Sequence, residues 1–214
     1  MVTGPSRPAV PPEPPNGERR PEPPPRSSSS FRALSGARTP LGGDEAALHL
    51  ARAWSTVLGE PAPARALELL WAQWALETGR GQAMRGNNFG GIKAERGGAL
   101  LETTEGFGSS RTRVKARFRT YSTPEDGARD HVSLIARRYP GALEALRRGD
   151  AAGFVRELSQ GGYFTADPET YRRGIEQLAA EHASSNAGGS SGGVASTNFV
   201  DGVLLALRPR ATEP

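Results

Sequence analysis

One glutamate stands where a buried helix is expected to end. The stretch Ala75–Gly81 reads ALETGRG and follows a run rich in leucine and tryptophan, so Glu77 lies between an apolar helix and a turn with two glycines. A carboxyl desolvated on one side holds its proton to a higher pH and can act as a general acid toward a leaving oxygen. Glycines beside it would let a long substrate approach the backbone closely. Position alone leaves a second interpretation open, in which the side chain turns outward to solvent.

Apolar periodicity predicts the helices that must position this glutamate. The segment that precedes Glu77 is apolar nearly all round, which is typical of a central, buried helix. Asp44 is expected to cap the first helix, and Thr123 with Pro124 and Asp126 forms a start signal for the third. Tyr171, Ile175 and Leu178 are expected to face inward from the last helix. The five predicted helices cover residues 43–59, 62–77, 122–139, 150–162 and 167–183.

One segment follows a two-residue period instead. In residues 111–119, RTRVKARFR, the even positions hold Thr, Val, Ala and Phe, and the odd positions are all basic. This alternation predicts a strand with one basic face, and the preceding LLETTEGFGSS supplies a partner strand and a turn. Residues 100–119 are therefore predicted to form a β-hairpin, and the fold class is α+β, mostly α.

Composition divides the chain into four parts. Residues 1–40 hold eleven of the eighteen prolines and a serine run, which predicts a disordered tether. The folded domain is expected over residues 41–183. Residues 184–198 form a Gly/Ser linker, and residues 199–214 a short tail.

The same composition excludes several classes of site. Cysteine is absent, so there is no disulfide, thiol nucleophile or cysteine metal site. His49, His131 and His182 show no metal-ligand spacing and are expected to fill surface or core positions. Trp54, Trp71 and Trp74 are expected in the core, with a sugar subsite as the alternative for one of them.

Neither a signal peptide nor a membrane helix is evident in the sequence. We therefore expect a soluble protein that is made in the cytoplasm and delivered by a route other than general secretion. The net charge of +4 comes largely from the N-terminal region, where six Arg face three Glu in residues 1–40. The folded part is close to neutral, which does not favour a nucleic-acid partner.

Four motifs occur in an order that resembles a known family. They are ALETGRG, NNFGGIKA, ARFRTYSTPEDGARDHVSLI and GGYFTADPETYRRGIEQL, spread over roughly residues 44–182. The chain is similar to the glucosaminidase family, glycoside hydrolase family 73, which includes flagellar rod peptidoglycan hydrolases and bacterial and phage autolysins. The resemblance implies a lysozyme-like helical domain with a small β lobe. It also implies hydrolysis of β-1,4 bonds in peptidoglycan, on the reducing side of N-acetylglucosamine, without a metal or cofactor.

The resemblance assigns the two carboxylates of the reaction. Glu77 matches the general acid. The second carboxylate lies nine residues before the valine of the strand, and counting back from Val114 gives Glu105. Glu102 and Glu95 are competitors for that role. A solvated hairpin glutamate is the alternative interpretation of Glu105.

The resemblance also assigns a tyrosine and a set of substrate contacts. Tyr163 matches the family's active-site tyrosine, and the alternative is a core tyrosine that bonds the backbone. Two departures from the family pattern are an extra glycine in NNFGGIK and Ala166, inserted before Asp167. The expected substrate-binding residues are Asn88, Phe89, Gly90, Lys93, Tyr121 and Thr165.

Three other functions remain open at this point. A muramidase or lytic transglycosylase would act on the same glycan and could work with one carboxylate. A non-catalytic wall-binding or assembly module would keep only the fold, and a nucleic-acid-binding module would rest on the basic residues. For the favoured hydrolase we expect action in the periplasm or cell wall, with peptidoglycan strands as partner and no membrane insertion. The N-terminal tether would connect it to cell-envelope, flagellar or phage machinery.

Overall fold

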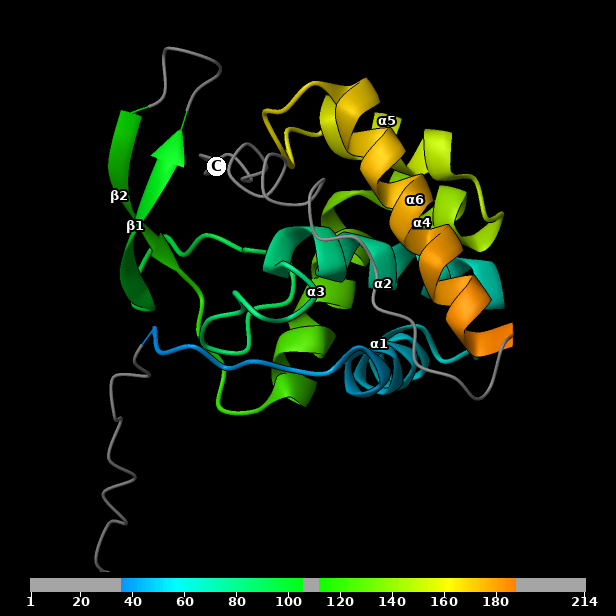
Figure 1. The fold of residues 1–214 in the computed structure, drawn as a ribbon, viewed down its shortest axis with the longest axis horizontal. Coiled ribbons are helices and arrows are strands. Elements are labelled where there is room, and N and C mark those ends of the chain that lie inside the picture. Colours follow the sequence, from blue (N-terminus) through cyan, green and yellow to red (C-terminus); the bar gives the residue numbers. More distant parts are fainter. Residues whose placement is uncertain (1–35, 106–111, 188–214) are drawn as a thin grey trace, which may run out of the picture. The chain divides into compact units, whose positions relative to one another are not determined.

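The fold is mostly helical, with a small antiparallel sheet, as the sequence predicts (Figure 1). A computed structural model of the chain describes residues 36–105 and 112–187. No helix among these residues is long and apolar enough to cross a membrane. The elements are α1 (Gly43–Leu58), α2 (Ala64–Thr78), β1 (Ala99–Glu105), β2 (Thr112–Phe118), α3 (Pro124–Arg138), α4 (Pro140–Arg147), α5 (Ala151–Gln160) and α6 (Pro168–Ala187).

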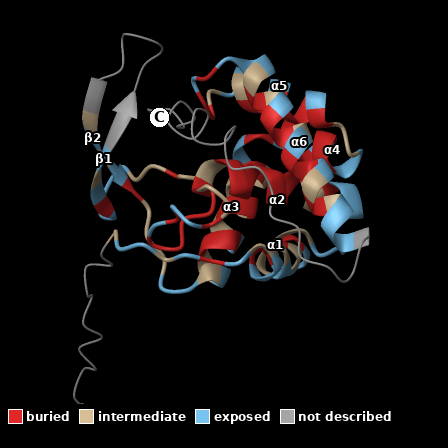
Figure 2. Ribbon diagram, viewed as in Figure 1, coloured by how far each residue is buried: buried red, intermediate tan, exposed pale blue. Residues whose placement is uncertain are grey.

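Helix α2 is the centre of the hydrophobic core (Figure 2). It packs against α6, α1 and α4, and ten of its fifteen residues are buried, with exposed residues only in its first turn. Trp54 and Trp74 are fully buried and Trp71 nearly so, which confirms the expectation that the tryptophans belong to the core. From α6, Tyr171, Ile175 and Leu178 face inward as predicted.

Two predicted helix starts have different outcomes. Thr123 caps α3 as expected: its hydroxyl accepts a hydrogen bond from the Asp126 amide at 3.1 Å, with Pro124 in the first turn. The cap predicted for α1 is wrong, because that helix begins one residue before Asp44. Gly42 occupies the cap position, and its amide donates to the Glu45 carboxylate at 3.4 Å.

Helix α4 is absent from the sequence prediction. It begins at Pro140, directly after α3, and only Tyr139 separates the two helices. Tyr139 ends α3 and also precedes the first residue of α4. The eight residues of α4 bury two Ala and two Leu against the core. A helix this short gives too few turns for its period to be recognised apart from its neighbours.

The predicted hairpin is confirmed, with β1 and β2 paired antiparallel. Ala99 pairs with Phe118 at the base, and Glu105 pairs with Thr112 at the far end. A third short segment joins the base: Lys93 forms a bridge with Phe118, and the Ala94 amide donates to the Arg117 carbonyl at 2.9 Å. These bonds tie the hairpin to the loop that follows α2.

The boundaries predicted for the tether and the linker need correction. Residues 36–41, here called the N-terminal strap, run beside the loop of residues 84–87. The Thr39 amide donates to the Met84 carbonyl, and the Gly86 amide to the Ala37 carbonyl, each at 3.0 Å. At the other end α6 continues to Ala187, past the expected linker start at residue 184. Residues 1–35 and 188–214 lie outside the described part.

Candidate active site

Glu77 is the last residue but one of α2 and is half-buried. The helix ends because Gly79 adopts a left-handed conformation, with φ of 57°. Thr78 holds the turn that follows, since its hydroxyl donates to the Trp74 carbonyl at 2.6 Å and accepts from the Gly81 amide at 2.9 Å. The structure therefore places this glutamate at the end of a buried helix, as the sequence predicts.

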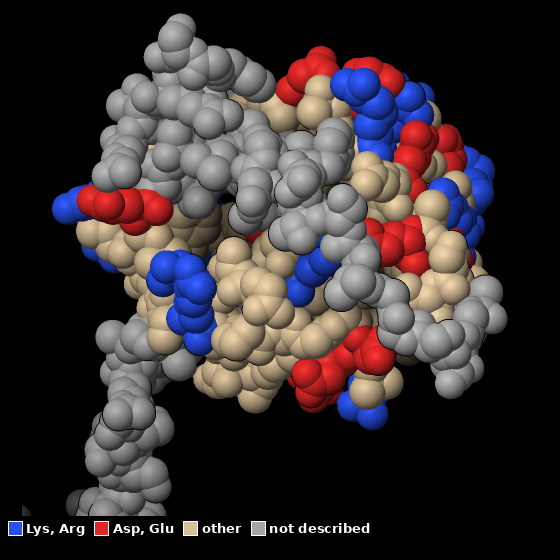
Figure 3. All heavy atoms as spheres, viewed as in Figure 1, with Lys and Arg blue, Asp and Glu red and all other residues tan. Residues whose placement is uncertain are grey.

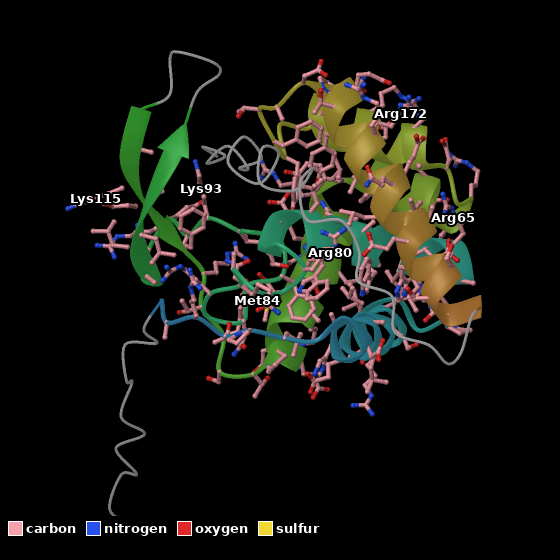
Figure 4. All side chains as sticks on the ribbon, viewed as in Figure 1. Arg65, Arg80, Met84, Lys93, Lys115 and Arg172 are labelled. Atoms are coloured by element: carbon pink, nitrogen blue, oxygen red, sulfur yellow. The ribbon has the colours of Figure 1, made fainter. Side chains whose placement is uncertain are left out.

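The turn after Glu77 is fixed from two further sides. Gly81 has φ of 83°, and a Cβ there would collide with the carbonyl of Leu41 in the N-terminal strap. Arg80 lies between α2 and α6 (Figure 4) and pairs with Glu181 through two hydrogen bonds of 3.0 and 2.6 Å. The pairing of Arg80 with Glu181 and the close contact of Gly81 with Leu41 therefore hold the end of α2 in one place.

Tyr171 reaches the Glu77 carboxyl from α6. Its hydroxyl lies 3.3 Å from Glu77 Oε1 as donor, and the Gln73 Nε2 donates to that hydroxyl at 3.4 Å. Tyr171 and Gln73 are fully buried, and Phe164 stacks on the tyrosine ring at 4.0 Å. Burial, together with the Glu77 carboxylate, raises the pKa of Tyr171 well above its usual value, so the hydroxyl stays protonated. The sequence places this tyrosine in the core but gives no sign of this contact.

In the loop after α2, Gly91 brings backbone without a side chain close to the other oxygen of Glu77. Gly91 has φ of 59°, and a Cβ at that position would stand 3.4 Å from Glu77 Oε2. A side chain at Gly90 would meet His131 and the Tyr163 hydroxyl at 2.5 Å. Both positions therefore favour glycine, Gly90 because a side chain there would meet its neighbours and Gly91 because of its positive φ.

Tyr163 lies behind this loop and is fully buried. Its hydroxyl donates to the Gly90 carbonyl at 2.9 Å, and Tyr139 packs edge-on against its ring at 5.6 Å. Burial raises the pKa of Tyr163 well above its usual value, and the charge of Glu77 adds to that effect. The contact with backbone is the one expected of a core tyrosine, and the role in catalysis stays a prediction.

Asn88 and Phe89 shape the loop from within. The Asn88 side chain donates to the carbonyls of Ile92 and Arg119 at 2.9 and 3.0 Å and accepts from the Ile92 amide at 2.9 Å. Phe89 is fully buried beside Trp74, with ring centroids 6.2 Å apart. Both residues therefore fix the path of the backbone that ends at Gly91.

The remaining expected substrate contacts are dispersed. Lys93 is half-buried at the base of the hairpin, and Thr165 is exposed before α6. The Tyr121 hydroxyl donates to Asp130 at 2.6 Å, and Arg119 pairs with the same oxygen at 2.7 Å. Burial raises the pKa of Tyr121. Two grooves lined by described residues meet at Tyr121, and Glu77 lines neither of them.

The hairpin register separates the candidate second carboxylates. Glu105 belongs to the row of Ala99 and Leu101, whereas Glu102 belongs to the opposite row and pairs with Lys115. Glu102 is exposed, and Lys115 stands at the outer side of the hairpin (Figure 4). Glu95 is exposed in the loop before β1. The side chain of Glu105 lies outside what the structure describes, so its role stays a prediction.

Two further polar residues have structural surroundings. Asp167 accepts hydrogen bonds from the amide and the hydroxyl of Thr170, both at 2.8 Å, and these bonds lower the pKa of its carboxyl. It is therefore a helix cap for α6. His131 is fully buried, and burial lowers its pKa to about 4. Among the described residues no three His, Asp or Glu side chains are grouped so as to hold a metal ion.

Comparison with known proteins gives the family of this chain. The model described as mannosyl-glycoprotein endo-beta-N-acetylglucosaminidase, the glucosaminidase family, matches residues 63–184, more than half of the 214 residues. The chain belongs to the glucosaminidase family. The matched residues run from the start of α2 into the last turns of α6, so they include Glu77, the glycine loop, the hairpin and Tyr171.

Two curated relatives are both named peptidoglycan hydrolase FlgJ. The protein from Vibrio parahaemolyticus is 38% identical over 122 residues, which is 51% of this chain and 38% of the relative. The protein from Pseudomonas aeruginosa is 34% identical over 125 residues, which is 52% of this chain and 30% of the relative. The chain thus spans roughly a third of the length of these relatives.

Solved structures similar to this chain carry related names. A peptidoglycan hydrolase from Sphingomonas sp. A1 is 25% identical with a TM-score of 0.47, covering 69% of this chain and 94% of that one. The truncated glycoside hydrolase domain of Salmonella typhimurium FlgJ is 26% identical with a TM-score of 0.45, covering 66% and 98%. The catalytic domain of the autolysin Auto from Listeria monocytogenes is 20% identical with a TM-score of 0.48, covering 69% and 88%.

Proposed function

We propose that this protein hydrolyses β-1,4 glycosidic bonds of peptidoglycan, as an endo-β-N-acetylglucosaminidase. The observation that carries the proposal is the Glu77 carboxyl, held by Tyr171 on one oxygen and bordered by the bare backbone of Gly91 at the other. Membership of the glucosaminidase family supports the bond type. The names of the FlgJ relatives support peptidoglycan as the substrate.

In the proposed reaction Glu77 is the general acid. Its proton passes to the glycosidic oxygen as the bond from that oxygen to the anomeric carbon breaks. Water then adds to the anomeric carbon and releases a proton, so the products are two shorter glycans. Tyr171 orients the acid through its hydrogen bond to one carboxyl oxygen, and Gln73 supports it by donating to the Tyr171 hydroxyl. No metal is needed at any step.

Glu105 is the proposed partner of this acid. It would take the proton from the attacking water or steady the substrate's own acetamido group. Carboxyl groups about 5–5.5 Å apart suit a covalent retaining route, and those about 6.5–9.5 Å apart suit an inverting route. Glu105 is the last residue of β1 and pairs with Thr112 at the far end of the hairpin. In the register Glu105 belongs to the same row as the buried Phe118, whereas Glu102 belongs to the opposite row and is exposed. This difference favours Glu105 over Glu102.

The other expected site residues have less direct roles in the proposed reaction. Tyr163 and Asn88 would act through the loop, since both bond its backbone. Phe89 and Gly90 would do so by packing. Lys93, Tyr121 and Thr165 are proposed contacts for sugars or stem peptides along the glycan strand.

The proposed substrate determines the place of action. Peptidoglycan lies outside the inner membrane, so the protein would act in the periplasm or cell wall. The FlgJ names suggest a flagellar setting, in which residues 1–35 would connect the enzyme to envelope machinery. Pull-down of the full chain and of a chain lacking residues 1–35 would show whether that segment recruits a partner.

Digestion of purified sacculi, followed by mass spectrometry of the fragments, tests the proposal. A glucosaminidase leaves N-acetylglucosamine at the new reducing end, a muramidase leaves N-acetylmuramic acid, and a lytic transglycosylase leaves an anhydro sugar. Glu77→Gln keeps the shape of the side chain and loses the transferable proton, so turbidity loss should cease while the fold persists. Turnover at the wild-type rate in this variant would refute the role of Glu77. Binding without any cleavage by the wild type would indicate a non-catalytic module.

A further inference from the structure

Two arginines face each other across the N-terminal strap. The strap and the loop of residues 84–87 form an antiparallel bridge in which Arg38 is opposite Arg85. The hydrogen bonds around the pair join Thr39 to Met84 and Gly86 to Ala37, so the two arginines form a non-hydrogen-bonded pair. In such pairs the Cα atoms are about 4.5 Å apart and the side chains lie close together.

No carboxylate neutralises this arginine pair within the described residues. Both side chains are exposed, and toward residues 36–105 and 112–187 the one hydrogen bond from either is that of Arg85 Nη1 to the Gly36 carbonyl at 3.0 Å. Five of the nine arginines in the described helices are paired with acids, as Arg65 is with Glu68 and Arg172 with Glu169 and Glu176. Like charges placed directly opposite each other across strands are destabilising. An anion between the guanidinium groups would remove that cost.

The surroundings of the arginine pair form a surface that could receive such an anion. Figure 3 shows a group of basic side chains over the loops beside the hairpin. Gly86, which follows Arg85, packs directly on Thr120, and Thr120 lines a groove of about 440 Å³. Arg96 and Glu95 line the same groove, together with Arg119, whose charge is balanced by Asp130. The groove contributes no excess charge of its own, so the positive charge of this surface is that of the arginine pair.

We propose that Arg38 and Arg85 bind the carboxylates of the peptide stems that peptidoglycan strands carry. This rests on the proposed function, because the stems come with that substrate. A planar guanidinium matches a carboxylate through two parallel hydrogen bonds, which makes arginine the suitable residue for this group. Arg85 is on the loop that ends at Gly91 beside Glu77, and six residues span at most about 22 Å. The pair is therefore no more than about 22 Å from Gly91, and a stem bound there would extend from the glycan toward the strap.

Binding to sacculi with and without stems tests the proposal. The full chain carrying Glu77→Gln would be sedimented with intact sacculi and with glycan strands from which an amidase has removed the peptides. Replacing both arginines with glutamine should weaken binding to intact sacculi about tenfold and leave binding to stripped strands unchanged. Arg52→Gln is the matched control, because Arg52 is an exposed arginine on α1 and its loss should change neither.

Three results would overturn the proposal that the arginine pair binds peptide stems. Binding of the double variant could fall equally on intact sacculi and stripped strands, or fall on neither. It could also fall only on sacculi that retain phosphate polymers, which would make phosphate the ligand. Failure of the proposed hydrolysis is a separate result, because it appears as absent cleavage by the wild type whatever the binding variants do.

Thermal stability gives a second measurement that separates binding from folding. Arg38→Glu replaces the repulsion with an opposite-charge pair, so this variant should melt at a higher temperature than the wild type while binding intact sacculi more weakly. A lower melting temperature would show that the arginines hold the strap rather than a ligand. Arg85→Lys keeps the charge without the planar fork and should lie between the wild type and Arg85→Gln in binding.

Discussion

At the scale of single residues, the Tyr171 hydroxyl is the feature of the site that the sequence hides. It is 94 positions from Glu77 along the chain, and nothing in its local pattern distinguishes it from Ile175 or Leu178 on the same helix face. Glu77 itself is recognisable, because a charged residue before two glycines interrupts an apolar run. A local signal therefore finds the acid, and only the packing of α6 on α2 finds the group that holds it.

Tyr171→Phe should lower kcat with little change in KM. The substitution keeps the ring that stacks on Phe164 and removes the donor to Glu77 Oε1. A hydrogen bond to a neutral carboxyl contributes about 0.5–1.5 kcal/mol, so a loss of roughly two- to tenfold is expected. Steady-state kinetics on soluble glycan strands measure it. Tyr139→Phe is the matched control, since Tyr139 is also a buried tyrosine but does not bond Glu77. Equal losses in both variants would contradict the role of Tyr171.

At the scale of elements, alternation within the hairpin could be predicted and the strap could not. Basic residues at every second position predict a strand because one face of a sheet needs a period of two. The strap has the composition of the preceding tether, yet its backbone bonds Met84 and Gly86, more than forty residues away. That pairing depends on the conformation of the loop of residues 84–87, which cannot be predicted from the composition of the strap.

Replacement of the three hairpin carboxylates tests the register. Glu105→Ala should reduce turnover by at least about a hundredfold, because general base catalysis typically contributes 10²–10⁴-fold. Glu102→Ala and Glu95→Ala should change it little, since both side chains are exposed and Glu102 pairs with Lys115 in the opposite row. Initial rates on the same glycan strands give the comparison. A large loss at Glu102 instead would mean that the other row carries the carboxylate. Small losses at all three would favour a single-carboxylate transglycosylase.

Two N-terminal deletions test the boundary between tether and strap. Removal of residues 1–35 should leave the melting temperature nearly unchanged, because that stretch has no apolar periodicity. Removal of residues 1–40 also takes away the acceptors of the Gly86 and Asn87 amides, which belong to buried residues. Each lost hydrogen bond contributes about 0.5–1.5 kcal/mol net of its replacement by water, so a fall of several degrees is expected. Scanning calorimetry of both deletions measures the difference, and equal melting temperatures would show that the strap contributes nothing.

At the scale of the whole molecule, local signals gave most of the helices and missed the shortest one. The start of α3 was predictable because a hydroxyl cap and a proline leave a readable pattern, whereas α4 has no cap side chain and follows α3 after one residue. The same limit applies to the site. Its carboxyl, glycines and hairpin each have a local sign, but their convergence depends on the core that α2 and α6 build together.

His131 in that core should make the fold of the protein sensitive to acid. Burial lowers its pKa to about 4, and the nearby Asp130 opposes this only in part. An unfolded chain binds the proton near pH 6.5, so between about 6.5 and 4 the unfolded state holds more protons than the folded one. The contribution of the neutral His131 ring to the free energy of unfolding is therefore complete above the pKa of the unfolded state. It is lost as the pH falls toward the pKa of the folded state. The loss amounts to roughly 3 kcal/mol at pH 4. Urea unfolding from pH 7.5 to 4.5 should show this slope in the wild type and a flatter one in His131→Gln. If that variant does not fold, the imidazole resonance in the wild type gives the answer, and titration near pH 6.5 would contradict the prediction.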